Sequence, residues 1–521
     1  MKKILRIRNA LISVFDKKNI FELSNFLFKK NINLMSTGGT FSYLKKKGLK
    51  VKEISKYIEF PEILNGKVKT LHPKIHAGIL CRKGYDDHII KKYSIIPIDM
   101  VIVNLYPFSQ ISKIKTSTLE NIINNIDIGG VSLIRAAAKN YEHVLVVTNC
   151  NDYDKIMLEI DSNNFIKQDV CFEFAKKAFQ CTANYDYNIS NYLYSINNSK
   201  KFPQDFSLNF SKKQDLRYGE NPHQKAALYI EKNYILPSIV TAKKVQGQKL
   251  SYNNISDVNV ALECVKEFLE PTCVIVKHMN PCGVSTRKTI LESYKNAYLA
   301  DPVSAFGGVI AFNRELDKET AQCILKQQFV EVIIAPSLTK EAKQIIEIKN
   351  NIRLLVYGFW TDNNIAEAFD YKKVNGGILI QDIDNKKINF NDINIVTKKK
   401  PSDYEIENAF FSWKIVKFVK SNAIVCAKNL QTIGIGIGQT SRVFSIKIAN
   451  LKAIDAGFNF DKSIMASDAF FPFRDSIDLA ASFGITCIIQ PGGSIRDNEI
   501  INAANEHNIS MIFTHIRHFK H

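Results

Sequence analysis

What this 521-residue chain lacks excludes several classes of protein at the outset. It has no run of about 18 consecutive apolar residues, the length that an apolar membrane-spanning helix needs. Its basic first residues are followed by neither an apolar signal region nor a small-residue cleavage site, so we expect a first strand there and a cytoplasmic protein. Low-complexity segments are absent too, and a hydrophobic content of 45% is ordinary for globular domains.

Cysteine pairs are missing as well. The ten cysteines occur singly, without a Cys-x-x-Cys pair, which excludes the common zinc and redox motifs. A chain of this length has room for about two to four domains with substantial cores, so scattered thiols predict free cysteines in a reducing compartment. We therefore expect neither structural disulfides nor a bound metal.

The net charge of +19 leaves two interpretations open. Lysine-rich proteins bind nucleic-acid phosphates by releasing counterions. Alternatively, the charge reflects a general abundance of Lys, Asn and Ile. The basic residues are spread along the chain rather than gathered into a tail or stripe, which favours the second interpretation. A smaller part of the charge would attract anionic substrates.

The N-terminal part of the chain alternates apolar runs with helical periodicity, which predicts an α/β domain with a parallel sheet and helices on both faces. The expected strands are residues 10–14, 32–36, 99–105 and 143–148. A helix with Ile20, Leu23, Phe26 and Leu27 on one face should follow the first strand. A second helix should end at Gly48, a good C-cap residue.

A polar stretch at residues 194–214 indicates a domain boundary. We expect an N-terminal domain at 1–195, a linker at 196–213 and a C-terminal domain at 214–521. In the second domain, the run from Cys273 to His278 and its later aromatic loop are echoed by Ala423–Asn429 and a similar loop. A duplicated α/β unit would explain this echo, and chance similarity between buried strands would explain it equally well.

Two segments of the N-terminal domain suit phosphate or oxyanion binding. Ser36-Thr-Gly-Gly-Thr40 lies between a strand and a helix, where helix amides bind anions, although a plain strand-to-helix turn would look similar. Gly66–Lys74 carries three lysines and a histidine around a proline, which disfavours a helix. In an extended segment Lys67 and Lys69 would share one face, unless the loop is merely solvated.

Two further segments add a tyrosine and an aspartate. Tyr106 follows a buried strand, and Asp127 precedes a Gly-Gly turn into a helix. The carboxyl ends of parallel strands are where such sheets bind ligands, so we expect these side chains to converge there with the lysines.

Ser-Thr-Gly-Gly-Thr, Val-Lys-Thr-Leu-His-Pro, Asn-Leu-Tyr-Pro-Phe and Asp-Ile-Gly-Gly-Val, in this order and spacing, closely resemble the inosine monophosphate cyclohydrolase domain, whose fold is similar to methylglyoxal synthase. The resemblance implies ring closure by attack of a carboxamide nitrogen on a formyl carbon, with loss of water. Lys69 and Tyr106 would then stabilise the oxyanion or supply a proton, and Asp127 would orient the amide. The resemblance places Lys139 in the same site. It implies substrate binding by Ser13, Lys17, Ser36, Thr37, Gly38, Gly39, Thr40, Lys67 and Thr70.

Two positions depart from this family's pattern. Phe15 stands where the family usually has a second serine, which removes a possible phosphate hydrogen bond. Lys67 stands where arginine is common and replaces a two-pronged contact with a point charge. The expected consequence is weaker phosphate binding with an intact catalytic set.

The densest motif of the C-terminal domain is Val274–Gly283, an apolar strand that ends in Lys277 and His278. Neighbours on a strand point to opposite faces, so both reach one site only if the chain bends. We expect the Asn-Pro-Cys-Gly segment that follows to supply the bend. A solvent-facing lysine beside a core-capping histidine would fit the pattern too.

Two other stretches have open interpretations. Alternating Ile and Gly at 433–438 predict a strand against which another backbone or a flat ligand packs, and they do not match the dinucleotide-binding pattern. After a predicted strand at 511–514, the histidine-rich end of the chain would either pack or bind metal adventitiously.

Leu-Arg-Tyr-Gly-Glu-Asn-Pro-His-Gln, Lys-His-Met-Asn-Pro-Cys-Gly and Ser-Asp-Ala-Phe-Phe-Pro-Phe-Arg-Asp resemble the aminoimidazole carboxamide ribonucleotide transformylase domain, whose two halves share a cytidine deaminase-like fold. With the first domain, the resemblance covers almost the whole chain and points to the bifunctional family of late purine synthesis. It implies 10-formyltetrahydrofolate as formyl donor and a homodimer with a shared transformylase site.

The resemblance also assigns roles in the C-terminal domain. His278 would take a proton from the 5-amino group, Lys277 would tune that histidine and stabilise the oxyanion, and Asn422 would hold the formyl oxygen. The implied ribonucleotide-binding residues are Arg217, Tyr218, Asn254, Gly307, Arg442 and Arg517, and the implied folate-binding residues are Phe470 and Asp475.

Two rival interpretations remain open. One is a basic nucleotide-binding or nucleic-acid-binding protein without catalysis, motivated by the charge and by Phe15 and Lys67. The other keeps the transformylase with an impaired cyclohydrolase. The intact Lys277, His278 and Asn422, and the absence of a nucleic-acid-binding motif, favour the bifunctional enzyme.

Overall fold

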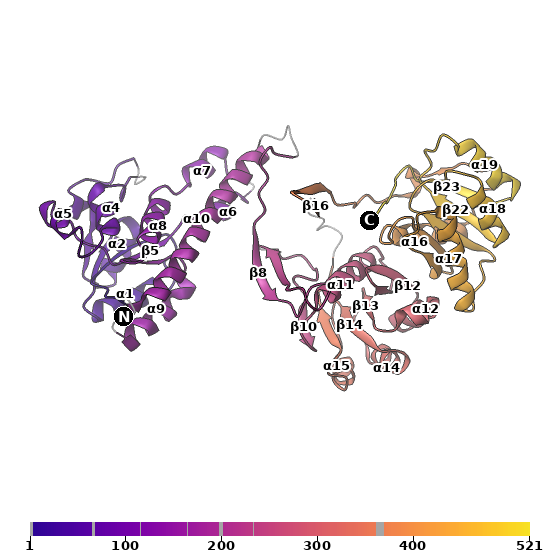
Figure 1. Cartoon of the computed structure of the whole chain (residues 1–521), viewed down its shortest axis with the longest axis horizontal. Helices are drawn as coiled ribbons and strands as arrows, with labels where there is room; N and C mark the ends of the chain where they lie inside the picture. Colours follow the sequence, from indigo (N-terminus) through magenta and orange to yellow (C-terminus); the bar gives the residue numbers. More distant parts are fainter. Residues whose placement is uncertain are drawn as a thin grey trace. The chain divides into compact units, whose positions relative to one another are not determined.

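The computed structural model describes residues 4–64, 68–114, 116–163, 165–196, 202–232, 234–360 and 369–521. The chain divides into two compact units, Met1–Asn209 and Phe210–His521. Each unit has a sheet of its own with helices packed against it (Figure 1). Among the described residues no helix is both long and apolar enough to cross a membrane.

The N-terminal unit is built on a five-stranded, wholly parallel sheet in the order β4-β3-β2-β5-β6. Each of the four expected strands is present within two residues of its predicted bounds, and the predicted parallel α/β sheet is confirmed. The strands of this sheet are β2 (Asn9–Val14), β3 (Asn33–Ser36), β4 (Val51–Glu53), β5 (Met100–Asn104) and β6 (Leu145–Val147), and β1 (Ile4–Leu5) pairs separately with β7 (Ile166–Lys167).

Helices cover both faces of this sheet because its strands are apolar on both sides. Ala10 and Ile12 of β2 belong to the core beneath α1 and α9, whereas Leu11 belongs to the core beneath α4 and α8. Residues along a strand alternate between faces, which accounts for the division. The helices are α1 (Ile20–Lys29), α2 (Gly38–Lys46), α3 (Ile54–Ile58), α4 (Pro73–Leu80), α5 (Asp87–Lys92), α6 (Phe108–Ile111), α7 (Leu119–Asn124), α8 (Gly129–Lys139), α9 (Tyr153–Asn163) and α10 (Gln168–Ile196).

The C-terminal unit contains one large mixed sheet in the order β10-β15-β14-β13-β11-β12-β20-β19-β21-β22-β23-β18. Two antiparallel hairpins lie outside it, β8 (Phe210–Asp215) with β9 (Ala227–Glu231), and β16 (Phe369–Val374) with β17 (Gly377–Asp382). The sheet strands are β10 (Lys243–Gln246), β11 (Thr272–Lys277), β12 (Asn280–Thr286), β13 (Gly308–Phe312), β14 (Val330–Ala335), β15 (Arg353–Val356), β18 (Asn394–Ile395), β19 (Ile424–Lys428), β20 (Gln431–Gly436), β21 (Ser463–Ser467), β22 (Ile485–Gln490) and β23 (Ser510–Phe513).

The two halves of this sheet repeat one arrangement. Each half runs from a helix into an antiparallel hairpin and then into three parallel strands, giving the strand orders β15-β14-β13-β11-β12 and β23-β22-β21-β19-β20. A register shift recurs at matching places, after Ile275 in β11 and after Cys426 in β19. The halves meet where β12 pairs with β20 at Ser285 and Gln431. The echo in the sequence therefore corresponds to a repeated topology.

One core cluster runs through both halves beneath the helices that open them, α11 and α16. The opposite face carries a separate core in each half, under α12, α14 and α15 in the first and under α17, α18 and α19 in the second. The helices of this unit are α11 (Tyr252–Val265), α12 (Ile290–Ala300), α13 (Pro302–Ala305), α14 (Lys318–Gln327), α15 (Lys340–Glu347), α16 (Asp403–Val416), α17 (Arg442–Asp455), α18 (Asp475–Ser482) and α19 (Asp497–Glu506).

The alternating Ile-Gly run forms β20 and packs against backbone. A Cβ atom on Gly434 would lie 2.2 Å from the carbonyl oxygen of Ala449, and one on Gly436 would lie 2.0 Å from that of Ser445. Both carbonyls belong to α17, so the glycines allow this helix to lie directly on the strand. Of the two partners predicted for the run, the structure shows a second backbone.

The histidine-rich end of the chain is packed rather than free. His518 is only 2% exposed, and its backbone N–H donates to the carbonyl oxygen of Asp468 at 3.0 Å. Ser421 N donates to the carbonyl oxygen of Lys520 at 2.8 Å. The described residues include no group of three His, Cys, Asp or Glu side chains arranged to hold a metal ion.

Candidate active sites

The carboxyl edge of the N-terminal sheet gathers most of the residues predicted for the first site. Because its strands are parallel, β2, β3, β5 and β6 all end at this edge, at Val14, Ser36, Asn104 and Val147. The segments that follow these strands carry Lys17, Thr37–Thr40, Tyr106 and Thr148. This is the edge at which parallel sheets bind ligands.

The start of α2 binds an anionic group in the structure, and that group is the side chain of Glu62. The hydroxyl of Thr37 donates to Oε1 of Glu62 at 2.5 Å, and the backbone N–H of Gly38 donates to the same oxygen at 3.0 Å. Lys69 Nζ lies 3.6 Å from Oε2 of Glu62. A helix N-terminus beside a lysine favours anions, so a carboxylate here stands where the sequence predicted a phosphate.

Ser36 and Thr40 serve the fold within this segment. The Ser36 hydroxyl donates to the carbonyl oxygen of Ile12 at 2.7 Å, and that of Thr40 donates to the carbonyl oxygen of Val14 at 2.9 Å. Both side chains are buried, so their hydroxyls join β3 and α2 to β2 instead of facing a ligand. Gly39 lies within α2, and Ser13 is half-buried on β2.

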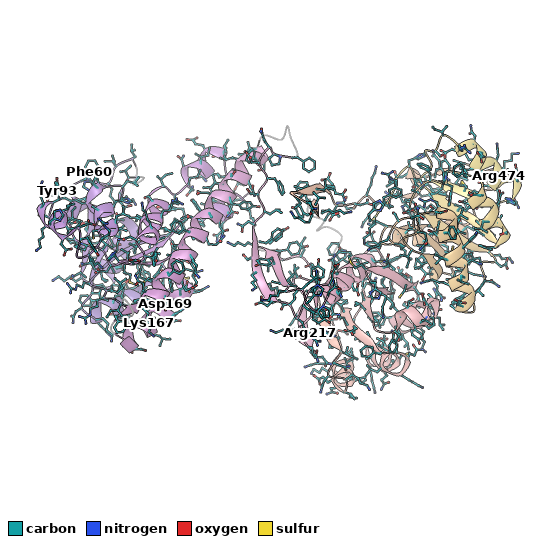
Figure 2. All side chains as sticks on the ribbon, in the orientation of Figure 1. Phe60, Tyr93, Lys167, Asp169, Arg217 and Arg474 are labelled. Atoms are coloured by element: carbon teal, nitrogen blue, oxygen red, sulfur yellow. The ribbon has the colours of Figure 1, made fainter. Side chains whose placement is uncertain are left out.

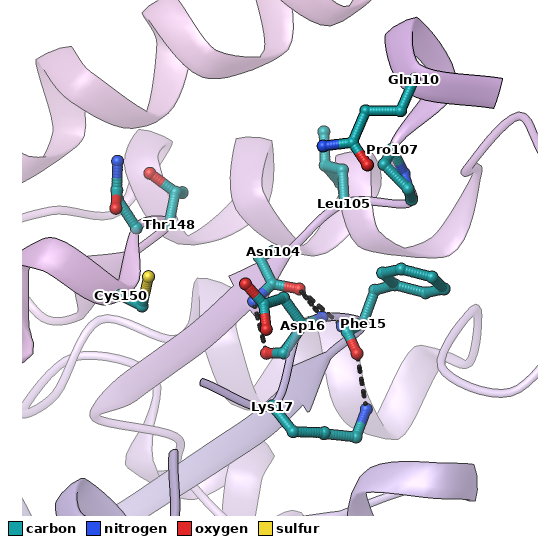
Figure 3. A pocket seen from close by; sticks show the side chains of 10 residues that line it. Phe15, Asp16, Lys17, Asn104, Leu105, Pro107, Gln110, Thr148 and Cys150 are labelled. Atoms are coloured by element: carbon teal, nitrogen blue, oxygen red, sulfur yellow. Dashed lines mark hydrogen bonds between the residues drawn. The ribbon is translucent and has the colours of Figure 1, made fainter. Parts of the chain in front are cut away.

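Lys17 and Lys69 lie close together at this edge. Burial lowers the pKa of the Lys17 ammonium; the charge of Asp16 opposes this, and that of Lys69 adds to it. The Lys17 Nζ donates to the carbonyl oxygens of Val14 and Phe15, and Figure 3 draws the bond to Phe15. Two neighbouring ammonium groups repel each other, and a phosphate or an oxyanion between them would relieve the repulsion.

Asp127 is fixed at the start of α8 beside Tyr106. Its Oδ1 accepts from Gly130 N at 2.7 Å, and its Oδ2 accepts from Tyr106 N at 3.4 Å. Burial raises the pKa of the Asp127 carboxyl, while these two hydrogen bonds and the charge of Lys69 act against the rise. Thr70 is also nearby, since a Cβ on Gly129 would lie 3.1 Å from its Oγ1. Lys69, Thr70, Tyr106 and Asp127 therefore belong to one group.

Phe15, the departure noted in the sequence, packs on Tyr106. The two ring centroids are 5.1 Å apart and tilted by 55°. Asn104 fixes the backbone here, because its Oδ1 accepts from Phe15 N at 2.5 Å and from Asp16 N at 3.0 Å (Figure 3). The phenyl ring thus stands beside Tyr106 at a position where a serine hydroxyl was expected.

A cavity of about 500 Å³ opens at this edge (Figure 3). Several residues that line it were not predicted from the sequence. Thr148 could have been, because it directly follows β6 and parallel sheets bind ligands at the carboxyl ends of their strands. The cavity is lined by Phe15, Asp16, Lys17, Asn104, Leu105, Pro107, Gln110, Thr148, Asn149 and Cys150.

Lys139 lies at the far end of α8 from this group, and its role in the site stays a prediction. It is the last residue of α8, whose first residue, Gly129, lies beside Thr70. At 1.5 Å per residue, the helix carries the chain about 15 Å from Gly129. Because α8 connects β5 to β6, it runs back toward the amino edge of the sheet, where Lys139 is exposed. Lys67 lies outside the described residues.

In the C-terminal unit, His278 sits on the two-residue turn that joins β11 to β12. His278 and Met279 have φ values of 51° and 62°, so both residues are left-handed. Such a turn is typical of a tight hairpin. The Asn-Pro-Cys-Gly segment forms β12 instead, so the prediction that it supplies the bend was wrong. The bend comes one residue earlier, and it leaves His278 exposed.

Lys277, the last residue of β11, reaches the loop before β13. Its Nζ donates to the carbonyl oxygen of Phe306, and a Cβ on Gly307 would lie 3.3 Å from this nitrogen. Gly307 has a φ of 68°, which suits a glycine. The loop therefore places a backbone, without a side chain, directly beside the Lys277 ammonium.

Asp257 of α11 lies under the same turn and was missed in the sequence. Its Oδ1 accepts from Met279 N at 2.7 Å. Burial raises the pKa of the Asp257 carboxyl, and the hydrogen bond from Met279 and the charges of His278 and Lys277 oppose the rise. One acidic residue within a helix gives no signal in the sequence, because only the packing of α11 against the hairpin brings it there.

Asn422 and Arg442 belong to a buried polar network in the second half. Arg442 Nη2 donates to Oδ1 of Asn422 at 2.7 Å, and its Nη1 donates to Oδ1 of Asp468 at 2.5 Å and to Ser467 Oγ at 2.7 Å. Asp468 is fully buried and pairs with the guanidinium. The network fixes the amide of Asn422, whose Nδ2 donates to the carbonyl oxygen of Gln439 at 2.8 Å.

A hydrogen bond between the halves brings these two groups together. Lys420 N donates to Oδ1 of Asn280 at 2.9 Å. Asn280 is two residues beyond His278, and Lys420 is two residues before Asn422. The histidine turn and the asparagine network therefore flank the same junction between the first and second half.

The other predicted ligands are more scattered. Asn254 is buried at the start of α11, where it completes a capping box with Ser251 and donates to Glu331 at 3.5 Å. Arg217, in the segment between β8 and β9 (Figure 2), lies 5.4 Å from the ring of Tyr218 and donates to Gln248. Arg517 is exposed and lies over the Phe519 ring.

The two residues predicted to bind folate both follow Asp468 in the sequence. Phe470, which is 36% exposed, follows Asp468 by two residues, and Asp475 begins α18. Asp475 Oδ1 accepts from the backbone N–H of Ser476 at 2.7 Å.

Comparison with known proteins finds two family matches along the chain. Residues 19–132 match the family described as MGS-like domain, and residues 137–452 match the one described as AICARFT/IMPCHase bienzyme. The second match covers more than half of the chain. This chain belongs to the AICARFT/IMPCHase bienzyme family.

Membership of the bienzyme family associates two enzyme activities with this chain. The family combines a formyltransferase acting on aminoimidazole carboxamide ribonucleotide with inosine monophosphate cyclohydrolase, the final steps of inosine monophosphate synthesis. The five-stranded parallel sheet is the MGS-like domain. The chain also resembles a solved structure titled "Crystal structure of ForH", at 28% identity, over 36% of this chain and 99% of that chain, with a TM-score of 0.32.

Proposed function

We propose that the two successive reactions of the family, formyl transfer and ring closure, occur at the two sites described above. Formyl transfer from 10-formyltetrahydrofolate would use Lys277, His278 and Asn422 of the C-terminal unit. Ring closure of the formylated nucleotide would use Lys69, Tyr106 and Asp127 at the carboxyl edge of the N-terminal sheet. The hydrogen bond from Lys420 to Asn280 carries the first assignment, because it holds the histidine turn and the asparagine loop at one junction.

In the first step, the 5-amino nitrogen attacks the formyl carbon, and His278 removes the proton that this nitrogen loses. The ammonium of Lys277 and the amide of Asn422 stabilise the oxyanion, which then collapses as the folate nitrogen leaves with the proton that His278 returns to it. His278 is exposed on its turn and so accessible to a substrate, while Asn422 is already oriented by Arg442. Arg217, Tyr218, Asn254, Gly307, Arg442 and Arg517 are proposed to bind the ribonucleotide, and Phe470 and Asp475 the folate.

In the second step, the carboxamide nitrogen attacks the formyl carbon of the same molecule, and water leaves. A weak nucleophile gains most from orientation, which the carboxylate of Asp127 supplies. Lys69 stabilises the oxyanion, and the Tyr106 hydroxyl donates a proton to the leaving oxygen. The phosphate would bind to Thr37 and Gly38 at the start of α2, displacing Glu62 from them.

The domain limits proposed are 1–195 for the cyclohydrolase and 214–521 for the transformylase, with a linker at 196–213. The repeated strand order of the second unit supports two cytidine deaminase-like halves. A homodimer with a shared transformylase site is proposed as well. It is supported by exposed apolar side chains near Lys277, with Val303 87% and Phe306 60% exposed. Sedimentation at several concentrations tests the dimer.

The first test is a coupled assay on the full chain with aminoimidazole carboxamide ribonucleotide and 10-formyltetrahydrofolate. Tetrahydrofolate release and inosine monophosphate formation are followed separately. Both products are expected. Folate turnover without inosine monophosphate would contradict the assignment of the N-terminal site, with Phe15 and Lys67 as the residues to examine.

Lys69→Ala separates the sites further. We expect cyclisation of supplied formylated nucleotide to fall by about 100-fold or more, because one charged oxyanion donor is lost. Formyl transfer should stay at the wild-type rate. Wild-type cyclisation in this variant would remove Lys69 from the site.

A further inference from the structure

Asp257 and Asn408 occupy the same place in the two halves of the C-terminal unit. Each lies six residues beyond a serine that caps the opening helix with a capping box, Ser251 for α11 and Ser402 for α16. Each side-chain Oδ1 accepts a 2.7 Å hydrogen bond from a backbone N–H of the hairpin turn above it, Met279 in the first half and Leu430 in the second.

The two turns also match in backbone conformation. In the second half, Asn429 and Leu430 both have a φ of 52°, as His278 and Met279 are left-handed in the first. Lys428, like Lys277, closes its strand and donates to a backbone carbonyl, that of Asp461 at 2.8 Å. The second turn thus has the same structure as the first, with Asn429 in place of His278.

Since Asn408 holds its turn with a neutral amide, holding the turn does not require a carboxylate. The amide of Asn408 has a partner for its N–H as well, because its Nδ2 donates to the carbonyl oxygen of Tyr404 at 2.9 Å. The equivalent carbonyl in the first half belongs to Asn253, four residues before Asp257. An asparagine at 257 could therefore accept from Met279 N through its amide oxygen and donate to the carbonyl oxygen of Asn253 through its amide nitrogen.

A carboxylate in this position is costly, since burial disfavours its charged form. Its negative charge lies beside His278 and Lys277, which both lower its pKa. The second half, which has an asparagine on the turn instead of a histidine, has an asparagine beneath it too. The carboxylate is therefore present in the half whose turn carries a histidine and absent from the half that has the turn alone.

We propose that Asp257 is a positioning residue for formyl transfer, which holds the turn of His278 and sets its negative charge against the His278–Lys277 pair. This inference rests on the proposed function. The charge favours the protonated histidine that forms when His278 has taken the proton from the amino group, and it keeps the Lys277 ammonium from disfavouring that form. Among the described residues, the charged residue Lys420 also bonds to this region, through its backbone N–H to Oδ1 of Asn280.

The test compares Asp257→Asn, Asp257→Ala and Asn408→Ala with the wild-type full chain and His278→Ala. For each we would measure kcat and KM of formyl transfer from pH 5.5 to about 9, cyclisation of supplied formylated nucleotide, and the midpoint of thermal unfolding. The pH range covers the region in which a histidine base titrates.

Asp257→Asn should keep the wild-type unfolding midpoint, cyclisation and ribonucleotide KM. Its kcat for formyl transfer should fall by about 10-fold to 100-fold, less than the loss caused by removing the base itself. The acid limb of its pH profile should move to lower pH. Asn408→Ala is the matched control: it removes the equivalent hydrogen bond, so its unfolding midpoint should fall while kcat and the pH profile stay unchanged.

A wild-type kcat and pH profile in Asp257→Asn would overturn the proposal. So would equal losses of kcat in Asp257→Asn and Asn408→Ala, since these would indicate only a structural role. Asp257→Ala should show both defects together, a lower unfolding midpoint and a lower kcat. Absence of formyl transfer in the wild-type chain would instead overturn the proposed function on which this inference rests.

Discussion

The two halves of the C-terminal sheet share a frame and differ in the groups that could perform chemistry. In both, a capped helix lies beneath a hairpin whose turn has two left-handed residues, and the last strand residue before the turn is a lysine. The first half adds a histidine and a half-buried carboxylate, His278 and Asp257. The second has Asn429 and Asn408. A fold can therefore keep a turn in both copies and place reactive groups in one.

The second half contributes something different to the junction. Its Asn422 is oriented by Arg442, which is paired with the fully buried Asp468. A buried guanidinium–carboxylate pair is rigid and well suited to aim a neutral amide. Under the proposed function, the first half would supply the proton acceptor and the second half an oxyanion ligand.

The largest expected effect comes from making the first turn like the second. His278→Asn should lower formyl transfer by about 10²–10⁴-fold, the usual contribution of a positioned base. Asparagine tolerates the left-handed conformation, so the fold should be unchanged. Tetrahydrofolate release measures the loss, and cyclisation by the same variant should equal that of the wild type. A loss below tenfold would show that His278 does not account for the functional difference between the two turns.

Close packing of helix on strand should matter equally in both halves. A Cβ on Gly283 would lie 2.0 Å from the carbonyl oxygen of Ala297, and one on Gly434 would lie 2.2 Å from that of Ala449. Gly283→Ala and Gly434→Ala should each lower the free energy of unfolding by about 1–3 kcal/mol or more, because the backbones must separate. Denaturant titration measures both. A large loss of unfolding free energy in one variant alone would show that the helix does not pack on the strand equally closely in the two halves.

Asn408→Asp gives the second half the carboxylate of the first. Burial should raise the pKa of the new carboxyl, as it does for Asp257. A group whose pKa is raised in the folded state costs stability above that pKa, and the cost disappears as the pH falls toward its unfolded value of about 4. We expect a loss of about 1–3 kcal/mol at neutral pH, because the amide's hydrogen bond to Tyr404 is lost too.

Unfolding of Asn408→Asp and of the wild type at several pH values measures this prediction. The difference between the two should shrink as the medium becomes acidic. A difference that does not depend on pH would show that the new carboxyl stays in contact with water, and that the two positions are not equivalent.

The smallest effect is expected when the second turn receives a histidine. Asn429 is exposed, so Asn429→His should change the free energy of unfolding by less than about 0.5 kcal/mol. It should not restore formyl transfer to His278→Ala, because Asn408 and not a carboxylate lies beneath that turn. Restored activity in the double variant would show that a lysine and a histidine on such a turn are enough.

Sequence periodicity by itself determined the parallel sheet of the N-terminal unit, because strands buried on both faces are apolar throughout and helices between them are amphipathic. The motif resemblance placed the family, and it also predicted the groups around Lys69 and His278. Its assignment of Lys139 stays a prediction, because Lys139 lies at the far end of α8 from Gly129.

Only the tertiary structure decided the contacts between segments distant in sequence. The sequence did not show that Glu62 lies on the start of α2, that Phe15 packs on Tyr106 or that Asp257 lies beneath Met279. The same holds for the hydrogen bond from Lys420 to Asn280, which joins the halves over 140 residues. Such contacts arise where helices pack on sheets and loops meet at a sheet edge. Local pattern does not encode them, because it reports which face of an element is buried and not what lies against it.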